Sequence, residues 1–190
     1  MSAAIAPKIV SISGSLRDPS RTATLTWDIA QSVLLRLGGQ HRHLPLSEIA
    51  PHVTQSWHAD GLDPQGRALI GTIESADILV VGTPVYRAAP AGLLKHVFDL
   101  VHRDALRGRI AILAATGGSL LHGLVIEHHL RPLLSYFGVH TTPTTLFAHE
   151  SDFTDGAIAN PGLQERIERA SGETARLFSS LPRLVEPALP

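Results

Sequence analysis

The sequence predicts a doubly wound α/β domain in which helices cover both faces of a five-stranded parallel sheet. Short apolar runs bounded by turn residues stand at Ile9–Ile12, Ile78–Val81 and Ile110–Ala115, as expected for strands that are buried on both faces. Segments with the apolar spacing of helices lie between these runs. Strands that alternate with helices in this way form parallel sheets with right-handed crossovers.

The expected helices are defined by their apolar spacing and by residues that start or stop helices. Apolar side chains from Leu25 to Leu37 share one helical face, and Gly38-Gly39 would end that helix. Asp63-Pro64 supplies an N-cap and a first-turn proline for a second helix, which runs to about Glu74. Three further helices are expected at residues 93–101, at about 120–137 with Gly138 as its C-cap, and at about 161–178.

Two weaker strands, His41–Leu46 and Val139–Phe147, complete the expected sheet. They contain Pro45 and Pro143, and both are expected to be edge or interrupted strands because proline cannot donate a ladder hydrogen bond. The sequence contains no internal repeat and no sign of a second domain. Residues 1–190 are therefore expected to form one domain.

Both ends of the chain, residues 1–7 and 181–190, are expected to be flexible tails. The C-terminal tail has three prolines and would be either a disordered end or an arm onto a neighbouring subunit. The first residues lack the basic start and the apolar stretch of a signal peptide. Every apolar run is far shorter than the roughly 20 residues of a membrane span. We therefore expect a cytoplasmic protein without membrane contact.

The composition favours a small molecule as the partner. The chain has a formal net charge of -1 and no run of Lys or Arg, so nucleic acids and anionic membranes are poor partners. It has no cysteine, which excludes disulfides and Cys-ligated metals. Its 11 histidines do not show a metal-ligand spacing, and no metal is expected. No catalytic acid, base or nucleophile motif is present, and none is assigned.

Hydroxyl and guanidinium side chains crowd the turn after the first strand. Those that could hold a phosphate are Ser15, Arg17, Ser20 and Thr22. The following helix would add its free N–H groups and the positive end of its dipole. The turn lacks the Gly-Lys-Ser/Thr of a P-loop and the pattern Gly-x-Gly-x-x-Gly, which disfavours ATP and a tightly held dinucleotide. The alternative is that Ser20 only caps the helix and the other hydroxyls are solvated.

Two more loops follow the next core strands. In Thr83-Pro84-Val85-Tyr86-Arg87 a stiffened backbone and an aromatic side chain can border a planar ligand. Gly117-Gly118 has no side chains, so its N–H groups can approach the edge of a ring. Each loop alone could be an ordinary turn. Because the carboxyl ends of parallel strands face one crevice, the three loops together predict a site for a phosphate and a ring, such as FMN.

These segments resemble the NADPH-dependent FMN reductase family, and more narrowly the flavin reductases that serve bacterial sulfonate and methanesulfonate monooxygenases. The resemblance runs from Lys8 to about Phe178. Its most specific pieces are residues 14–21, 82–89, 92–95 and 115–118. It implies a flavodoxin-like sheet with strand order 2-1-3-4-5, FMN and NAD(P)H as cofactors, and a homo-oligomer, either a dimer or a tetramer.

The resemblance also implies roles for the residues of the three loops. It assigns the FMN phosphate to Ser15, Arg17, Ser20 and Thr22. It assigns the isoalloxazine and ribityl groups to Pro84, Val85, Tyr86 and Arg87, and the polar edge of the ring to Thr116, Gly117 and Gly118. The wider family often has Pro-Glu-Tyr-Asn in the second loop, and the departure from it here matches the sulfonate-linked branch.

The expected fourth helix contains Pro132, which deprives the carbonyl of His128 of its usual donor. The helix should therefore bulge or kink between these residues. In the sulfonate-linked reductases this helix carries a one-residue insertion, Tyr or His, that makes a π-bulge at the oligomer interface. The resemblance places His128 at that position. The alternative is a tolerated kink with an exposed histidine.

The implied reaction is hydride transfer from reduced nicotinamide to FMN. FMN would enter as an exchangeable substrate, and reduced FMN would leave for a partner monooxygenase. A first alternative is an enzyme with bound FMN that reduces quinones, azo dyes or chromate. A second is a flavodoxin, a non-enzymatic electron carrier, although the net charge of -1 argues against that role. A third is a binding protein for another phosphate monoester.

Overall fold

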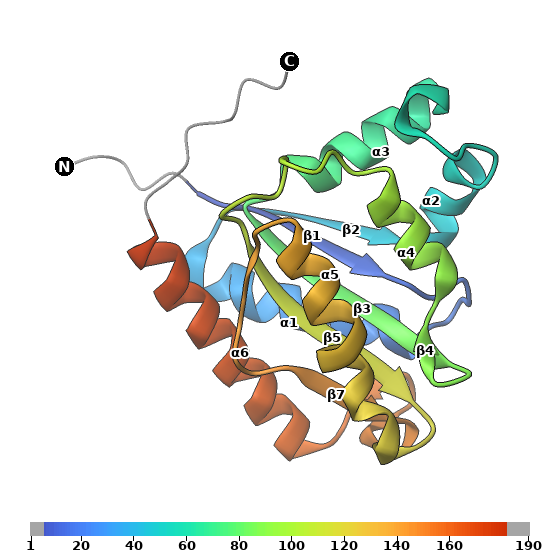
Figure 1. The fold of residues 1–190 in the computed structure, drawn as a ribbon. Coiled ribbons are helices and arrows are strands. Elements are labelled where there is room, and N and C mark those ends of the chain that lie inside the picture. Colours follow the sequence, from blue (N-terminus) through green and yellow to red (C-terminus); the bar gives the residue numbers. More distant parts are fainter. Residues whose placement is uncertain (1–5, 182–190) are drawn as a thin grey trace.

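One parallel sheet lies between two layers of helices (Figure 1). The computed structural model describes residues 6–181. The path through the sheet is β2-β1-β3-β5-β6, with β7 also paired to β5 and β4 paired to the end of β3. With the two-residue β4 set aside, this is the expected order 2-1-3-4-5. Residues 1–5 and 182–190, which make up most of the expected tails, lie outside the described residues.

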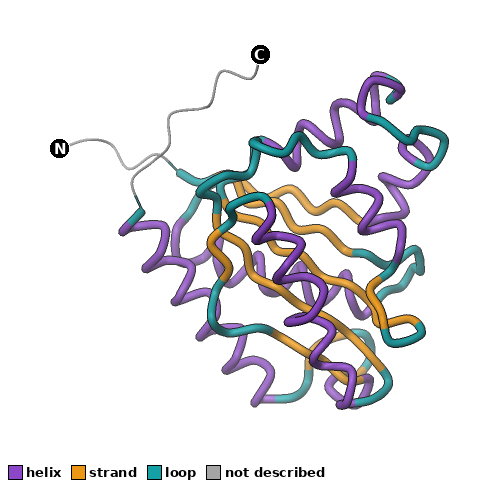
Figure 2. Tube along the Cα trace, in the orientation of Figure 1, coloured by secondary structure: helices purple, strands orange, loops and turns teal. Residues whose placement is uncertain are grey.

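The elements alternate along the chain as the sequence predicts (Figure 2). The strands are β1 (Lys8–Ser13), β2 (Gln40–Pro45), β3 (Ile78–Tyr86), β4 (Ala89–Pro90), β5 (Ile110–Gly117), β6 (His140–Thr141), β7 (Leu146–His149), β8 (Phe153–Thr154) and β9 (Ala157–Ile158). The α-helices are α1 (Arg21–Leu37), α2 (Leu46–Val53), α3 (Pro64–Glu74), α4 (Gly92–Asp99), α5 (Arg131–Tyr136) and α6 (Pro161–Ser180). Short 3₁₀ helices span Ala59–Gly61, Leu120–Leu124 and Glu150–Asp152, and a π-helix spans Ile126–Leu130.

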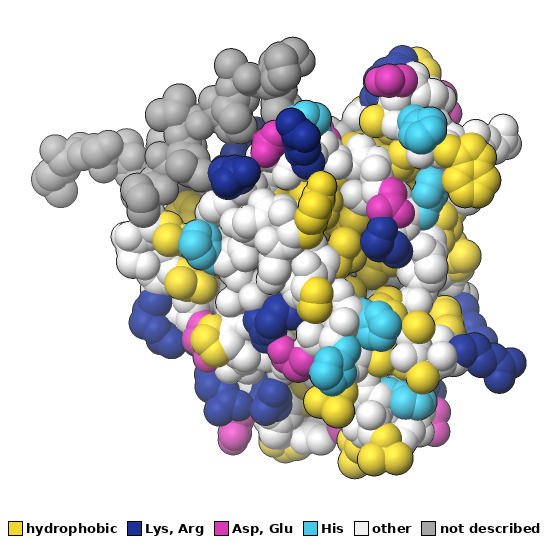
Figure 3. All heavy atoms as spheres, in the orientation of Figure 1, with side chains coloured by type: hydrophobic (Ala, Val, Ile, Leu, Met, Phe, Trp, Pro, Cys, Tyr) yellow, Lys and Arg dark blue, Asp and Glu magenta, His cyan; other side chains and the backbone are white. Residues whose placement is uncertain are grey.

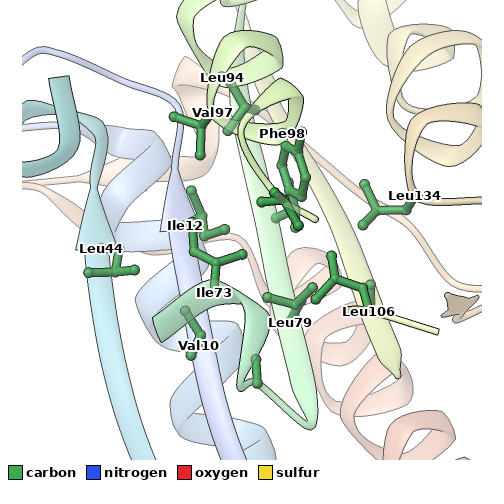
Figure 4. Close-up of a cluster of buried hydrophobic side chains, with 14 of the residues drawn as sticks. Val10, Ile12, Leu44, Ile73, Leu79, Leu94, Val97, Phe98, Leu106 and Leu134 are labelled. Carbon is green, nitrogen blue, oxygen red and sulfur yellow. The ribbon is translucent and has the colours of Figure 1, made fainter. Parts of the chain in front are cut away.

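Two apolar cores separate the sheet from its helices. α1 and α6 pack on one face, against side chains such as Ile9, Ile78 and Val80. α2, α3, α4 and α5 pack on the other face, where Val10 and alternate residues of the neighbouring strands meet them (Figure 4). Successive side chains of a strand point to opposite faces, so strands buried on both sides must be apolar throughout. No helix within residues 6–181 is long and apolar enough to cross a membrane.

The expected helix at about 120–137 is divided into three parts. A 3₁₀ helix, the π-helix and α5 follow one another there. In the π-helix the N–H of Arg131 donates to the carbonyl of Ile126, five residues earlier. Pro132 stands directly after this turn and has no N–H to donate. Gly138 follows α5 with φ +70, the left-handed conformation typical of a residue that ends a helix.

Besides the two-residue β4 and the 3₁₀ helices Ala59–Gly61 and Glu150–Asp152, two elements are absent from the sequence prediction. The first is α2, where Leu46, Ile49 and Val53 do have helical spacing, but the segment is only eight residues long and contains Pro51, which disfavours a helix interior. The second is the β8–β9 hairpin, which turns at Asp155-Gly156. An Asp-Gly pair between short apolar segments is a hairpin signal, and it could have predicted this turn. The interruption expected in the last strand is present, because residues 142–145 separate β6 from β7.

The start of α1 packs very closely on the sheet. A Cβ atom at Gly82, on β3, would lie 2.3 Å from Cγ2 of Thr26 on α1. Thr26 is fully buried, and its hydroxyl donates to the carbonyl of Thr22, 3.0 Å away, so its side chain has little freedom to move. Glycine at position 82 therefore allows α1 to begin directly above the carboxyl ends of the central strands.

Candidate functional site

A pocket of about 470 Å³ opens at the carboxyl ends of β1, β3 and β5. That volume lies in the range of about 300–1,000 Å³ typical of small-molecule sites. All three predicted loops contribute to it. Its lining consists of Ser15, Arg17, Pro19, Ser20, Arg21, Thr22, Thr24, Pro84, Val85, Tyr86, Thr116, Gly117, Gly118, Ala148, Glu150 and Gly156. The structure thus brings ten of the eleven predicted FMN contacts to one pocket, and Arg87 is the exception among them.

The first loop presents hydroxyl groups in a defined orientation. Ser20 is the N-cap of α1, and its Oγ accepts a hydrogen bond from the N–H of Ala23 at 3.2 Å. Oγ of Ser15 accepts one from the N–H of Arg17 at 3.1 Å. A hydroxyl that accepts from a backbone N–H keeps its own proton for another acceptor. Both serines therefore stabilise the loop and can still donate to a ligand oxygen.

The first and third loops are joined by a buried hydrogen bond. The hydroxyls of Thr22, on α1, and Thr116, at the end of β5, lie 2.7 Å apart. Both residues are buried. One of the two hydroxyls donates to the other, and the second proton remains available. The bond fixes the first turn of α1 relative to the Gly117-Gly118 turn.

The second loop continues β3 into a tight hairpin. The pair Val85–Tyr86 faces Ala89–Pro90, and the two residues between them, Arg87 and Ala88, have φ values of 52 and 62. This left-handed turn places Arg87 at the tip of the hairpin and outside the pocket lining. Tyr86 lines the pocket and is 44% exposed, so one part of its side chain is available to a ligand.

The third loop is held by a histidine that the sequence does not single out. Ser151 donates its backbone N–H to Nδ1 of His149 at 3.2 Å, so the ring proton lies on Nε2. That Nε2 donates to the carbonyl of Gly118 at 3.2 Å. A Cβ atom at Gly117 would lie 3.1 Å from the ring of Phe147, whereas Gly118 has open space. His149 and Phe147 therefore hold one side of the Gly-Gly turn, while the space at the Cβ position of Gly118 is open.

A fourth loop, residues 150–156, completes the pocket and is missing from the sequence prediction. Oε2 of Glu150 lies 3.2 Å from Nη1 of Arg21. The hydroxyl of Thr24 donates to the carbonyl of Gly156 at 3.2 Å. This loop follows β7, which lies beside β5, so it reaches the same edge of the sheet as the other three. The sequence prediction includes this interrupted strand but assigns no role to the loop that follows it.

The donor set of the pocket fits a phosphate monoester. Two serine hydroxyls, the first turn of α1 and the guanidinium groups of Arg17 and Arg21 stand together at the first loop. An ionised phosphate only accepts hydrogen bonds and is stabilised by cations and by a helix N-terminus. The second and third loops add apolar surface and a glycine backbone, which suit a flat ring. The residues present therefore fit FMN.

A second cavity, of about 310 Å³, lies between α4 and the π-helix. His128 and His129 line it together with Leu94 and Lys95. The π-helix is anchored on its other side, because Arg131 donates to Glu127 at 2.5 Å and to the hydroxyl of Thr141 at 2.5 Å. The hydrogen bond from Arg131 holds the pKa of the Glu127 carboxyl below its usual value. Ionised Glu127 therefore stabilises the folded protein at pH values above the pKa that its carboxyl has in the unfolded chain. This stabilisation is lost as the pH falls through the lower pKa of the folded state.

Comparison with known proteins points to one family. The family model described as NADPH-dependent FMN reductase matches residues 7–153. The NADH-dependent FMN reductase SfnF of Pseudomonas putida is 40% identical over 176 residues, which cover 92% of this chain and 94% of that protein. An FMN reductase (NADPH) of Pseudomonas aeruginosa is 38% identical and covers 94% of this chain and 96% of its own length.

A solved structure of an oxidoreductase from Corynebacterium diphtheriae has the same fold. The two chains superpose with a TM-score of 0.82 at 33% sequence identity. The match covers 93% of this chain and 98% of the other. The arrangement of the sheet and its helices is thus found in a related oxidoreductase.

Two substitutions of Ser20 separate its two possible roles. Ser20→Ala removes the N-cap and is expected to lower the free energy of unfolding by about 1 kcal/mol. Ser20→Asp keeps a good cap but places a carboxylate in the pocket, so stability should be retained while FMN affinity falls at least about tenfold by charge repulsion. Urea unfolding and flavin fluorescence titration measure the two effects. Unchanged FMN binding in Ser20→Asp would remove Ser20 from the phosphate site.

Proposed function

The chain belongs to the NADPH-dependent FMN reductase family and is an NAD(P)H-dependent FMN reductase, and on that basis we propose that it treats FMN as an exchangeable substrate. Reduced FMN would leave for a partner flavin-dependent monooxygenase. The pocket at the carboxyl ends of β1, β3 and β5 supports the flavin as ligand, because it gathers phosphate donors and a ring platform in one place.

The proposed contacts follow the position of each loop around the pocket. Phosphate oxygens would be held by Ser15, Arg17, Ser20 and Thr22. The isoalloxazine and ribityl groups would lie along Pro84, Val85 and Tyr86, with Arg87 at the outer tip of the hairpin, and the polar edge of the ring would meet Thr116, Gly117 and Gly118. Bound FMN supplies the chemistry, because its ring accepts a hydride from reduced nicotinamide.

The protein's own residues would contribute binding and orientation. Within the described part of the chain, the pocket lining contains no histidine, and Glu150, its one acidic residue, is already paired with Arg21. Hydride transfer between two cofactors needs aligned rings and exclusion of competing reactions more than a protein acid or base. A site built of hydroxyls, backbone groups and one aromatic side chain is suited to that task.

The proposed partner is a monooxygenase that acts on sulfonates. The support for it is the sequence of the second loop, Pro84-Val85-Tyr86-Arg87, which resembles the sulfonate-linked branch of the family. A reductase of this kind would work in the cytoplasm, where reduced nicotinamide cofactors and the partner enzyme are present. The near-neutral charge of the chain suits release of a small flavin better than tight docking of a charged redox protein.

We also propose that the π-helix lies at an interface between copies of this chain. Large apolar side chains are exposed beside it: Leu120 (76%), Leu121 (88%), Leu124 (62%) and Tyr136 (71%). Figure 3 shows this face, where histidine and hydrophobic side chains gather over the π-helix and the 3₁₀ helix before it. Apolar side chains grouped on one face are typical of a surface that another protein covers.

The rate of NAD(P)H oxidation tests whether flavin is a substrate. A catalytic amount of the protein is mixed with NADH or NADPH in air, and free FMN is raised far above the protein concentration. The rate should climb and saturate with FMN. A rate that ignores added FMN but depends on a quinone would mean that FMN is a fixed prosthetic group. Binding of FMN with no NAD(P)H oxidation would leave a flavodoxin or a simple phosphate-binding protein.

The size of the protein in solution tests the interface. Deletion of His128 should restore α-helical spacing ahead of Pro132, rotate the apolar side chains away from their positions and shift the assembly to a smaller species. Pro132→Ala should have a weaker effect in the same direction, because it restores one backbone donor. Light scattering after size-exclusion chromatography measures the mass. Unchanged mass for both variants would contradict the interface.

A further inference from the structure

An ion pair stands at the rim of the pocket and joins two of its loops. Arg21 is the first residue of α1, and Glu150 lies in the fourth loop, 129 positions later. Nη1 of Arg21 and Oε2 of Glu150 lie 3.2 Å apart, and the two side chains are 55% and 59% exposed. Both residues line the pocket. The pair is therefore part of the ligand site and is also open to solvent.

Glu150 has the wrong charge for a phosphate site. Among the lining residues, all of which belong to the described part of the chain, it is the one carboxylate, and the two cations are Arg17 and Arg21. A phosphate monoester carries about −1.5 to −2 charges at neutral pH and is repelled by a nearby carboxylate. A pocket selected only for tight FMN binding would gain affinity by leaving Arg21 unpaired.

Hydrogen bonds to the side chain of Asp152 hold the turn that carries Glu150. On one side, the N–H of His149 donates to Oδ2 of Asp152 at 2.7 Å. On the other, Oδ1 of Asp152 accepts from the side-chain amide of Asn160 at 2.6 Å. Asp152 thus closes the turn that carries Glu150, and this turn places Glu150 beside Arg21. The pair is a built feature of the pocket rim.

We propose that Glu150 competes with the FMN phosphate for Arg21 and thereby keeps FMN exchangeable. The proposal rests on the proposed function, in which flavin must leave after each turnover. With Glu150 present, Arg21 must give up one anionic partner before it can serve the phosphate. An exposed ion pair contributes up to about 1 kcal/mol, which corresponds to an affinity penalty of up to about fivefold. Glu150 is in this sense a residue that determines affinity and release.

Flavin titrations of the purified full chain test the proposal. Quenching of flavin fluorescence gives the Kd of FMN and of riboflavin, which lacks the phosphate, for the wild type and for Glu150→Gln. Glu150→Gln should tighten FMN by about three- to fivefold and slow its dissociation by a similar factor, while the Kd of riboflavin stays unchanged.

Asp99→Asn is the matched control, because it removes one carboxylate from another exposed ion pair, Lys95–Asp99. Asp99 ends α4, which runs back from the carboxyl edge of the sheet toward the opposite edge (Figure 1). Its loss changes the net charge by the same amount as Glu150→Gln and should leave FMN binding as in the wild type.

Arg21→Gln identifies the route of the effect. If Glu150 acts through Arg21, the double variant Arg21→Gln/Glu150→Gln should bind FMN no more tightly than Arg21→Gln alone. A gain that persists in the double variant, an equal gain for riboflavin, or an unchanged FMN Kd in Glu150→Gln would each overturn the proposal. Failure of the wild type to bind FMN at all would instead refute the proposed function, and the inference would fall with it.

Discussion

The close packing of the start of α1 on the ends of β3 and β5 is the constraint on which the site depends. Gly82 leaves room for Thr26, the hydroxyl of Thr26 donates to the carbonyl of Thr22, and the hydroxyl of Thr22 pairs with that of Thr116. These contacts are buried, where an unpaired hydroxyl would cost about 1–3 kcal/mol. They place the positive end of a helix above the crevice between neighbouring parallel strands, where ligands of this sheet class bind.

The chemistry of the pocket follows from that placement. Hydroxyls whose lone pairs already accept backbone N–H groups are left as donors, and an acceptor-only phosphate is the natural partner of such groups. The ring platform needs little beyond a stiff backbone and the Gly-Gly turn, which His149 holds through the carbonyl of Gly118. A lining of hydroxyls, backbone groups and an aromatic side chain agrees with a reaction in which both reacting rings belong to cofactors.

The sequence predicts those parts of the fold and site that depend on local pattern. The three central strands, the helices between them and the convergence of Ser15, Tyr86 and Gly117 on one pocket follow from apolar runs and turn residues. The parts that fail depend on tertiary contacts. α2 is a short helix with Pro51 inside it, and the fourth loop follows a strand that Pro143 interrupts, so local sequence signals for both are weak.

Two residues show a different kind of limit. Arg87 belongs to the expected segment, but a left-handed hairpin turn carries it outside the pocket, and no spacing rule for a non-glycine pair predicts such a turn. Glu150 is an ordinary acidic residue in the sequence. Its proposed role depends on its position beside Arg21, which lies 129 residues earlier in the chain. Local sequence pattern predicts the phosphate donors of the site, whereas the nearby carboxylate is found only from the tertiary structure.

A crystal structure of the chain with FMN tests most directly whether the pocket at the start of α1 holds the flavin. We expect the phosphate at the first turn of α1, within hydrogen-bonding distance of the hydroxyls of Ser15 and Ser20. The ring should lie between Tyr86 and the Gly117-Gly118 turn. FMN found in the cavity beside His128, or bound with its ring at α1 and its phosphate in solvent, would show that the first loop is not the phosphate site.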